Sequence, residues 1–514
     1  MNDVKKALIS VSNKDNVIYL AQELVSLGYE IISTGGTYEQ LKHAQIDVKQ
    51  VESLTDFPEI LDGRVKTLHP HVHGGLLAKR GDETHEKQLA ENQIEPIDLV
   101  VVNLYPFKET LKNESATHED MIENIDIGGP TMLRAAAKNY SAITVVVDPD
   151  DYSEVIEQLK ADTLDASYRQ KLAAKVFQHT AQYDSLIAQY FSKLTGDEYP
   201  EHLTITYEKV QTLRYGENPH QQASFYKHPL AAETSLVNAE QLHGKELSFN
   251  NIQDANAAVE VVTEYEEPTT VAIKHMNPCG IGTGDTIEQS FQKAYEADSI
   301  SIFGGIVACN REVNLATAEA MSEIFLEIII APSFTDEAFS LLTKKKNIRL
   351  LRLRRVSNEE LQGIQKYVSI SGGLLVQEED AVNLDEESLT YPTNRQPTEA
   401  EMRDLLFAWK AVKHVKSNAI ALAKDNQTIG IGAGQMNRIG AAEIAIKQAA
   451  EKAKGSVLAS DAFIPMADTA ETAVKAGISA IIQPGGSARD QEVIDICNEH
   501  NIAMVYTGMR HFKH

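Results

Sequence analysis

Lys274 and His275 are the pair whose types and spacing most directly suggest chemistry. They follow a short apolar run, Thr270–Ile273, that predicts a buried β-strand. After them come a turn dipeptide and three glycines spaced two apart: Asn277-Pro278, Gly280, Gly282 and Gly284. Open α/β sheets carry their chemistry at strand ends over Gly-rich turns, and adjacent Lys and His can serve as acid and base near pH 7. The alternative is a surface lysine beside a histidine that caps a strand end.

The first forty residues predict two successive strand–loop–helix units. Lys6–Val11 predicts a strand, Ser12 the N-cap of a helix, and Val17–Leu27 that helix. A second strand, Tyr29–Ser33, leads through Thr34-Gly35-Gly36-Thr37 into another helix. Exposed N–H groups and the dipole at a helix start favour binding of an anion, so both loops are candidate phosphate-binding sites. Serine and glycine also cap helices that bind nothing.

A third polar segment lies between residues 63 and 73. Arg64, Lys66 and Thr67 suit a phosphorylated or polar ligand, with the arginine as a bidentate clamp. His71 and His73 alternate on what is predicted to be an extended segment, which would place them on one face as metal ligands. Since no carboxylate or cysteine clusters beside them in the sequence, we favour the ligand-binding interpretation.

Two further segments of the first half carry candidate residues. The strand Leu99–Asn103 is followed at once by Tyr105. Asp126-Ile127-Gly128-Gly129-Pro130 predicts a helix start, because proline is favoured near the first helical position. The helix that follows has Arg134 and Lys138 four residues apart on one face, where a solvated basic stripe is the alternative to a functional role.

Length, charge and cysteine use limit the classes of protein. A chain of 514 residues predicts at least two domains, and TGDEYP at Thr195–Pro200 is the predicted linker between residues 1–199 and 200–514. A net charge of −26 argues against nucleic acid or an anionic membrane as the main partner. Three separated cysteines, no apolar run of membrane-spanning length and no signal-peptide pattern predict a cytoplasmic protein.

The order of motifs along the whole chain resembles one enzyme family. The first half contains SVSNKD, STGGT, GRVKTLHP, NLYPF, IDIGGPTMLRAAAKN and HTAQYD. The second half contains RYGENPHQ, LSFNN, IKHMNPCG, SIFGGIVA, SNAI, GIGAGQMNR, SDAFIPM, QPGGS and RHF. In this order they are similar to the bifunctional family of 5-aminoimidazole-4-carboxamide ribonucleotide (AICAR) formyltransferase/inosine monophosphate (IMP) cyclohydrolase. None of the motifs would suffice alone.

For the first half, the resemblance implies a methylglyoxal-synthase-like parallel α/β sheet and cyclisation of formyl-AICAR to IMP. The family assigns proton transfer to Lys138 and places Lys66, Tyr105 and Asp126 around the reacting groups. The positions that hold the nucleotide are Ser12, Lys14, Thr34, Gly35, Gly36, Thr37, Arg64, Thr67, Asn103 and Ile127.

For the second half, it implies tandem cytidine-deaminase-like α/β units and formyl transfer from 10-formyltetrahydrofolate to AICAR. The sequence echo between Ile281–Gly284 and Ile429–Gly434 agrees with an internal duplication. The family assigns the base to His275, its acid and electrostatic partner to Lys274, and orientation of the acceptor to Asn418. The remaining substrate-binding positions are Arg214, Tyr215, Asn256, Gly305, Glu327, Arg438, Asp461, Gly485 and Arg510.

The resemblance also implies a homodimer and an association of the transferase fold with potassium. Zinc is not expected, because Pro278-Cys279 lacks the second cysteine of a CxxC pair and no HxE motif lies upstream. The segment Asp380–Gln396 carries no motif that we can assign.

Two alternatives from other classes stay open. The first half could be a regulatory module that senses a nucleotide or phosphate, although a sensor would not need Lys66, Tyr105, Asp126 and Lys138 together. The chain could also be a metal-dependent nucleotide hydrolase or deaminase, which the missing ligand pairs disfavour.

Overall fold

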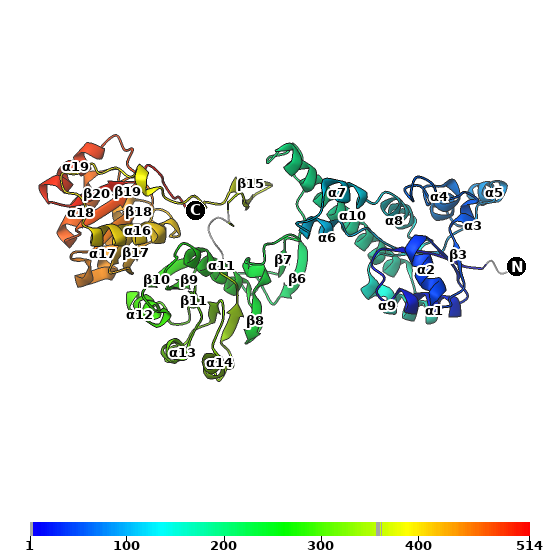
Figure 1. The fold of residues 1–514 in the computed structure, drawn as a ribbon, viewed down its shortest axis with the longest axis horizontal. Helices are drawn as coiled ribbons and strands as arrows, with labels where there is room; N and C mark the ends of the chain where they lie inside the picture. Colours follow the sequence, from blue (N-terminus) through cyan, green and yellow to red (C-terminus); the bar gives the residue numbers. More distant parts are fainter. Residues whose placement is uncertain (1–3, 356–359, 361) are drawn as a thin grey trace. The chain divides into compact units, whose positions relative to one another are not determined.

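The chain divides into two compact units in a computed structural model that describes residues 4–355, 360 and 362–514 (Figure 1). The first unit runs to Glu208 and also includes His228–Leu230. The second unit comprises Lys209–Lys227 and Ala231–His514. No helix in the described part of the chain is long and apolar enough to cross a membrane.

The first unit is built on a five-stranded parallel sheet. Its strands in spatial order are β3 (Val48–Gln50), β2 (Glu30–Ser33), β1 (Lys6–Val11), β4 (Leu99–Asn103) and β5 (Thr144–Val146). Strand order reverses between β1 and β4, and in open α/β sheets the crevice at such a switch point is where ligands bind.

Helices cover both faces of this sheet because alternate strand residues point to opposite sides. Ala7 and Ile9 of β1 pack with α1 (Val17–Ser26) and α9 (Tyr152–Lys160). Leu8 packs on the other side with three helices, α4 (Pro70–Leu77), α8 (Gly128–Lys138) and α10 (Ala166–Thr195). The shorter helices are α2 (Gly35–His43), α3 (Glu52–Thr55), α5 (Glu83–Glu91), α6 (Phe107–Lys112) and α7 (His118–Glu123).

Two local predictions in this unit were wrong. Ser12 does not cap a helix: α1 starts at Val17 with Asn16 as its N-cap, because the intervening residues form a loop held by side chains. His71 and His73 do not share the face of an extended segment, since Pro70 starts helix α4 and both residues lie within it.

The second unit contains one mixed sheet of eleven strands. Its order is β20 (Ala503–Tyr506), β19 (Ala480–Gln483), β18 (Val457–Ser460), β16 (Ile420–Lys424), β17 (Gln427–Gly432), β10 (Asn277–Thr283), β9 (Thr269–Lys274), β11 (Ile306–Cys309), β12 (Ile328–Ala331), β13 (Arg349–Arg352) and β8 (Glu240–His243). The first and second repeats meet where β10 pairs with β17.

The predicted internal duplication is confirmed by the order of elements. Each repeat has a helix, an antiparallel hairpin, a second helix, and three parallel strands joined by helices. The helices of the first repeat are α11 (Phe249–Thr263), α12 (Ile287–Ala297), α13 (Leu315–Ser322) and α14 (Asp336–Leu342). Those of the second are α16 (Glu399–Lys413), α17 (Arg438–Ala449), α18 (Ala467–Ala476) and α19 (Asp490–Glu499).

The glycines after His275 do not form the predicted Gly-rich turn. The turn of the β9–β10 hairpin is His275-Met276, and Gly280 and Gly282 lie inside β10. A Cβ atom on Gly282 would lie 2.6 Å from the carbonyl oxygen of Ser290, and one on Gly280 would overlap the backbone of α12. The glycines are therefore required for close packing of helix on strand.

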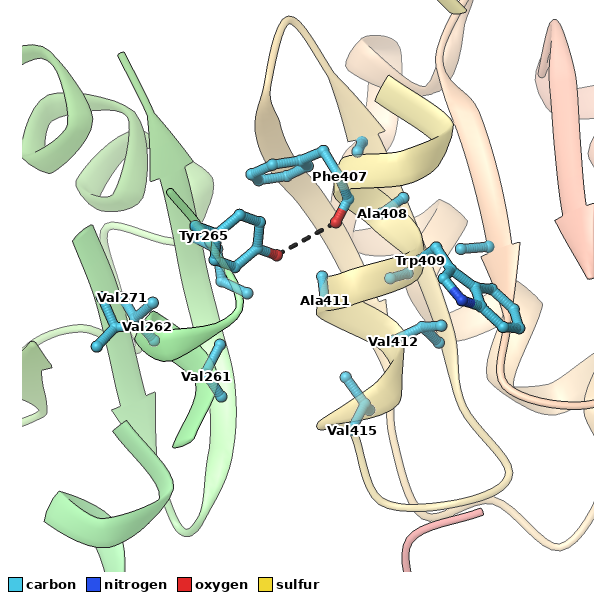
Figure 2. Packing of buried hydrophobic residues seen from close by; sticks show 14 of the residues in the cluster. Val261, Val262, Tyr265, Val271, Phe407, Ala408, Trp409, Ala411, Val412 and Val415 are labelled. Atoms are coloured by element: carbon cyan, nitrogen blue, oxygen red, sulfur yellow. Dashed lines mark hydrogen bonds between the residues drawn. The ribbon is translucent and has the colours of Figure 1, made fainter. Parts of the chain in front are cut away.

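Buried residues of helices α11 and α16 belong to one hydrophobic core that joins the two repeats (Figure 2). Val261 and Val262 of α11 lie in this core with Ala411 and Val412 of α16. The Tyr265 hydroxyl donates a hydrogen bond of 3.2 Å to the carbonyl oxygen of Phe407.

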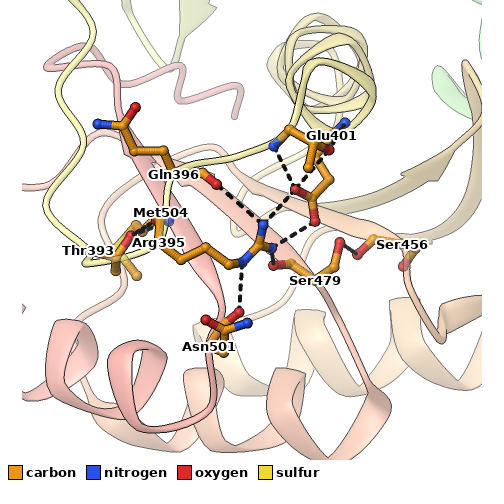
Figure 3. Close-up of polar contacts among 9 residues, drawn as sticks. Thr393, Arg395, Gln396, Glu401, Ser456, Ser479, Asn501 and Met504 are labelled. Carbon is orange, nitrogen blue, oxygen red and sulfur yellow. Dashed lines mark hydrogen bonds and ion pairs between the residues drawn. The ribbon is translucent and has the colours of Figure 1, made fainter.

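The segment without an assignable motif, Asp380–Gln396, ends in a structural clamp at Arg395 (Figure 3). Its guanidinium donates to both carboxylate oxygens of Glu401, at 2.7 and 2.8 Å, and to the carbonyl oxygens of Ser479 and Asn501, at 2.6 and 2.8 Å. Bidentate pairing of this kind fixes geometry, so Arg395 ties the start of α16 to strands β19 and β20.

Two hairpins pair with no other strand in the described part of the chain. They are β6 (Glu208–Leu213) with β7 (Ala223–Lys227) and β14 (Gln365–Ile370) with β15 (Gly373–Glu378).

Candidate functional sites

A cavity of about 600 Å³ opens at the carboxyl ends of β1, β2 and β4 in the first unit. It also meets the amino termini of helices α2 and α8, so two helix starts point their free N–H groups at one space. Its lining contains every first-half residue that the family resemblance implies except Lys138: Ser12, Lys14, Thr34, Gly35, Gly36, Thr37, Arg64, Lys66, Thr67, Asn103, Tyr105, Asp126 and Ile127.

The loop that presents Ser12 is shaped by Asn103. The Asn103 side-chain oxygen accepts hydrogen bonds from the backbone N–H groups of Ser12, at 2.7 Å, and Asn13, at 2.8 Å. Its amide nitrogen donates to the Asn13 carbonyl oxygen at 3.1 Å. The Asn103 side chain is thus engaged in positioning the loop.

Lys14 and Lys66 place two ammonium groups beside the start of α2. A Cβ atom on Gly36 would lie 3.4 Å from the Lys14 ammonium nitrogen, and one on Gly35 would lie 3.6 Å from that of Lys66. The buried Thr37 ties this helix start to β1 through hydrogen bonds with the backbone of Val11. Two cations beside a helix N-terminus can bind an anion even though the protein as a whole has a net negative charge.

Asp126 lines the same cavity, just before the start of α8. Its carboxylate accepts a hydrogen bond of 2.8 Å from the Gly129 N–H, and its own N–H donates to the Tyr183 hydroxyl at 2.7 Å. Burial raises the pKa of the Asp126 carboxyl, although backbone hydrogen bonds and the charge of Lys66 oppose this. Burial also raises the pKa of Tyr105, with smaller contributions from the charges of Asp126 and Glu59.

Several lining residues were missed by the sequence reasoning. The main polar ones are Ser10, whose hydroxyl is 2.7 Å from that of Thr34, and the two acidic residues Asp62 and Glu123. Glu123 pairs with Arg64 in an exposed ion pair. Ser10 could have been predicted from its position near the end of β1. Glu123 could not, because it lies in a helix outside any motif.

Lys138 lies away from the cavity lining. It is the exposed last residue of α8, whose first residue, Gly128, is in the lining. An eleven-residue helix is roughly 15 Å long. The family role of Lys138 in proton transfer therefore stays a prediction, whereas Lys66, Tyr105 and Asp126 are brought together in one cavity.

In the second unit, Lys274 ends strand β9 and His275 is the exposed first residue of the hairpin turn. His275 and Met276 both have left-handed backbone angles, with φ of 51° and 62°. The Lys274 ammonium donates to the Phe303 carbonyl oxygen at 2.6 Å. The imidazole is thus exposed, while its neighbour is anchored.

Asn277 links this turn to the segment of the second repeat that contains Asn418. Its side-chain amide donates to the His275 carbonyl oxygen at 3.1 Å, and its side-chain oxygen accepts from the Lys416 N–H at 3.0 Å. The predicted base and the SNAI segment are therefore brought close together although they are far apart in sequence.

Asn418 is held by a buried polar network. Its side-chain oxygen accepts a hydrogen bond of 2.8 Å from Arg438, and its amide donates to the Gln435 carbonyl oxygen at 2.8 Å. Arg438 also pairs with the fully buried Asp461. Asp461 in turn accepts hydrogen bonds from the Ser417 hydroxyl and the Ala419 N–H, so the Arg438–Asp461 pair positions the SNAI segment.

Gly305 and Glu327 lie at the neighbouring strand ends. The Gly305 carbonyl oxygen accepts the Glu327 N–H at 3.0 Å, and a Cβ atom on Gly305 would lie 3.0 Å from the carbonyl oxygen of Ile273. The Glu327 carboxylate pairs with Arg349 at 2.8 Å. These residues adjoin the strand that carries Lys274.

The other predicted residues of this half lie in separate places within the unit. Arg214 stacks over the Tyr215 ring in the loop between β6 and β7, with its guanidinium 5.7 Å from the ring centre. Asn256 donates to Glu260 on α11. Gly485 has φ of +73° in the loop after β19, and Arg510 lies over the ring of Phe512 near the end of the chain.

An open depression of about 580 Å³ begins two residues beyond His275, but its lining includes no predicted residue. Within the residues that the structure describes, no group of three or more His, Cys, Asp and Glu could hold a metal ion. In the described part of the chain, predicted residues come together in the cavity of the first unit, at the Lys274–His275 turn and in the network of Asn418, Arg438 and Asp461.

Comparison with known proteins identifies the family. A family model described as "AICARFT/IMPCHase bienzyme" matches residues 136–448, and one described as an "MGS-like domain" matches residues 16–131. The chain belongs to the AICARFT/IMPCHase bienzyme family. The predicted family, the α/β fold class with a methylglyoxal-synthase-like first half, and the predicted pair of enzyme activities are thereby confirmed.

Relatives of this family match along their full length. The bifunctional purine biosynthesis protein PurH of Oceanobacillus iheyensis is 61% identical, over 99% of this chain and 100% of its own. PurH of Bacillus subtilis is 59% identical, again over 99% of this chain and 100% of its own. PurH of Listeria monocytogenes is 59% identical with the same coverage.

Proposed function

We propose that the cavity of the first unit, within a cyclohydrolase domain of residues 1–199, binds formyl-AICAR and closes it to IMP with loss of water. The proposal is supported by one cavity whose lining combines Lys14, Lys66 and the start of α2 with Tyr105 and Asp126. The Lys14 ammonium and the helix N–H groups suit the phosphate of the nucleotide, while the charge of Lys66 also acts on Asp126.

Ring closure requires the carboxamide nitrogen to attack the formyl carbon and lose a proton, after which the tetrahedral oxygen leaves as water. Lys66 is placed to stabilise the developing oxyanion, since its ammonium faces the same space as Asp126 and Tyr105. A carboxyl group with a raised pKa can hold or release a proton at the reacting nitrogen. Lys138 is proposed as a further proton-transfer group.

Substitution of the two lysines tests this assignment. Lys14→Met should raise the KM for formyl-AICAR, since it removes one phosphate contact, whereas Lys66→Met should also lower kcat by about 100-fold through loss of oxyanion stabilisation. Lys171→Met, on exposed α10, is the matched control. Unchanged cyclisation in both cavity variants would disprove the site. A Lys138→Ala variant with normal cyclisation would remove Lys138 from the mechanism.

We propose that the second unit, within residues 200–514, transfers the formyl group of 10-formyltetrahydrofolate to the amine of AICAR. The His275 imidazole takes a proton from the weakly basic amine as it attacks the formyl carbon. The folate nitrogen leaves with a proton, giving formyl-AICAR and tetrahydrofolate. The link through Asn277 supports a site that combines His275 with Asn418.

His275→Ala should abolish formyl transfer without changing cyclisation of added formyl-AICAR. His220→Ala, in the loop between β6 and β7, replaces another exposed histidine of the same unit and is the control. Normal tetrahydrofolate production by His275→Ala would exclude the imidazole as the base.

We propose that the enzyme is a homodimer, and the β14–β15 hairpin supports this. Val368 and Leu375 are directly paired across the hairpin yet 42% and 57% exposed, and Ile370 on the same face is 52% exposed. An isolated two-stranded hairpin is marginal in water, and an exposed apolar face marks an interaction site. A Val368→Lys/Leu375→Glu double variant should sediment as a monomer while Ser369→Lys, on the opposite face, should not; a dimeric double variant would exclude this face.

Two further assignments are proposals. We place the enzyme in the cytoplasm, which the three free cysteines support because a reducing compartment keeps thiols unpaired; fractionation of cells tests this. Potassium is proposed as an ion of the transferase domain from the family resemblance alone. Formyl transfer should then be faster in potassium than in sodium buffer at equal ionic strength.

A further inference from the structure

The turn that carries His275 needs support from outside itself. Two successive residues with side chains, His275 and Met276, have positive φ angles, a conformation that costs energy for residues other than glycine. Such a turn keeps one shape only if neighbouring groups fix its backbone. The direction of the imidazole depends on that shape, because the ring is exposed and its position follows the backbone.

Asp254 supplies this support from helix α11. Its carboxylate accepts a hydrogen bond of 2.7 Å from the Met276 N–H. Burial raises the pKa of the Asp254 carboxyl, while the bonds to the Met276 and His275 backbone and the charges of His275 and Lys274 lower it. The half-buried carboxylate thus bonds the turn through its backbone and lies close enough to interact with the imidazole.

The second repeat contains the same clamp around a different turn. Asp404 accepts hydrogen bonds from the N–H groups of Asp425, at 2.9 Å, and Asn426, at 2.7 Å. Those two residues also have positive φ angles, of 54° and 55°. Asp254 and Asp404 are each the sixth residue of their helices, α11 and α16, and both helices begin with a capping box.

The lysine before each turn is anchored in the same way. Lys274 donates to the Phe303 carbonyl oxygen at 2.6 Å, and Lys424 donates to the Lys454 carbonyl oxygen at 3.0 Å. The two turns differ in the side chains that they present, His275-Met276 in the first repeat and Asp425-Asn426 in the second, and only the first presents an imidazole. Both repeats therefore hold the backbone of the turn in the same way, whereas the side chains on the turn differ between the repeats.

We propose that Asp254 is a positioning residue for formyl transfer, which holds the backbone of the His275–Met276 turn and thereby the direction of the imidazole. The inference rests on the proposed role of His275 as the base. A proton can pass to His275 only within hydrogen-bond reach of the amine, so a small displacement of the turn lowers the rate of the chemical step. Binding of AICAR and folate does not require Asp254.

The test compares Asp254→Ala and Asp254→Asn with Asp404→Ala. Asp254→Ala should lower kcat for formyl transfer by about 100-fold with both KM values nearly unchanged, since a displacement of about 1 Å has an effect of this size. Asp254→Asn keeps an oxygen acceptor for the Met276 N–H and should recover most of the rate. Asp404→Ala removes the matching clamp from the turn without histidine and should keep wild-type transfer.

Cyclisation of added formyl-AICAR and the melting temperature show whether each variant is folded, and Asp254→Ser replaces Asp254→Ala if the latter does not fold. An equal loss of formyl-transfer rate in Asp254→Ala and Asp404→Ala would mean that Asp254 acts only in folding, and it would overturn the inference. A wild-type kcat in Asp254→Ala would overturn it also. His275→Ala, measured alongside, separates the two proposals: if it retains transfer, the base assignment itself is wrong.

Discussion

At the scale of single residues, the proposed cyclohydrolase site combines groups whose environments differ sharply. Lys14 and Lys66 lie beside a helix start, where an anion is favoured, while Asp126 is buried enough that its charged form is disfavoured. Burial of this carboxyl group costs stability when it is charged, and we predict that its raised pKa serves proton transfer.

Asp126→Asn should separate stability from function. The pKa of Asp126 is raised in the folded state, so the folded protein favours the protonated carboxyl group. The stability that this protonation contributes is fully present below the ordinary pKa of 3.8 and is lost as the pH rises through the folded-state pKa. At pH 7 the variant should therefore melt at least as high as the wild type, because asparagine can still accept the Gly129 N–H. Cyclisation should fall.

Scanning calorimetry between pH 4.5 and 7.5, with cyclisation rates on the same samples, checks this prediction. The advantage of Asp126→Asn in melting temperature should shrink as the pH falls. A variant less stable than the wild type at pH 7 would mean that the carboxylate stabilises the fold.

Residues that line the cavity of the first unit could be picked out in the sequence because strand ends and Gly-rich helix starts have local signatures, as at Thr34-Gly35-Gly36-Thr37. It could not show that the side chain of Asn103 is engaged with a loop or that Arg438 and Asp461 bond each other, since these contacts join distant segments. Lys138 is the opposite case. It lies in a family motif, but it is the last residue of α8 and lies away from the cavity that the start of this helix lines.

At the scale of elements, the duplicated repeats depend on close packing of a helix over a hairpin strand. The sequence echo of alternate glycines predicted a duplication correctly, but the same glycines were wrongly expected in a turn. Local pattern cannot distinguish a flexible glycine from one that lies beneath a helix, because the helix concerned, α12, follows later in the chain.

Gly280→Ala should destabilise the second unit by about 1–3 kcal/mol, since a methyl group would overlap the Ala294 carbonyl and force α12 away from β10. Gly373→Ala, in the β14–β15 hairpin, is the control: its added Cβ would meet only the side chain of Ile370, at 3.3 Å. Denaturant unfolding measures both. Equal stability of the two variants would show that α12 can move without cost.

The Arg395 clamp should make the stability of the second unit depend on acid. Burial would raise the pKa of Glu401, but hydrogen bonds from Arg395 and the Thr398 N–H hold it at about 2, below its ordinary 4.5. A carboxyl group whose pKa is lowered in the folded state stabilises the fold at pH values above its unfolded-state pKa. This stability is lost as the pH falls through the folded-state pKa.

Glu401→Gln should therefore cost about 1–2 kcal/mol at pH 7, less than the full equivalent of the lowered pKa, because solvent screens part of the interaction with Arg395. Thermal melts from pH 7 to pH 2 test this. The difference from the wild type should persist down to about pH 4.5 and shrink below it. A difference that does not change with pH would assign the effect to packing.

At the scale of the whole molecule, each unit carries its own sheet, its own core and its own group of predicted residues. The product of the transferase is the substrate of the cyclohydrolase, so one chain can run two consecutive steps with separate chemistry. We therefore predict that the two sites act independently.

The most direct measurement supplies AICAR and 10-formyltetrahydrofolate and follows formyl-AICAR, IMP and tetrahydrofolate together in the wild type, Lys66→Met and His275→Ala. The wild type should form IMP and tetrahydrofolate. Lys66→Met should accumulate formyl-AICAR, and His275→Ala should leave AICAR unchanged yet cyclise added formyl-AICAR. Loss of both steps in both variants would contradict two independent sites.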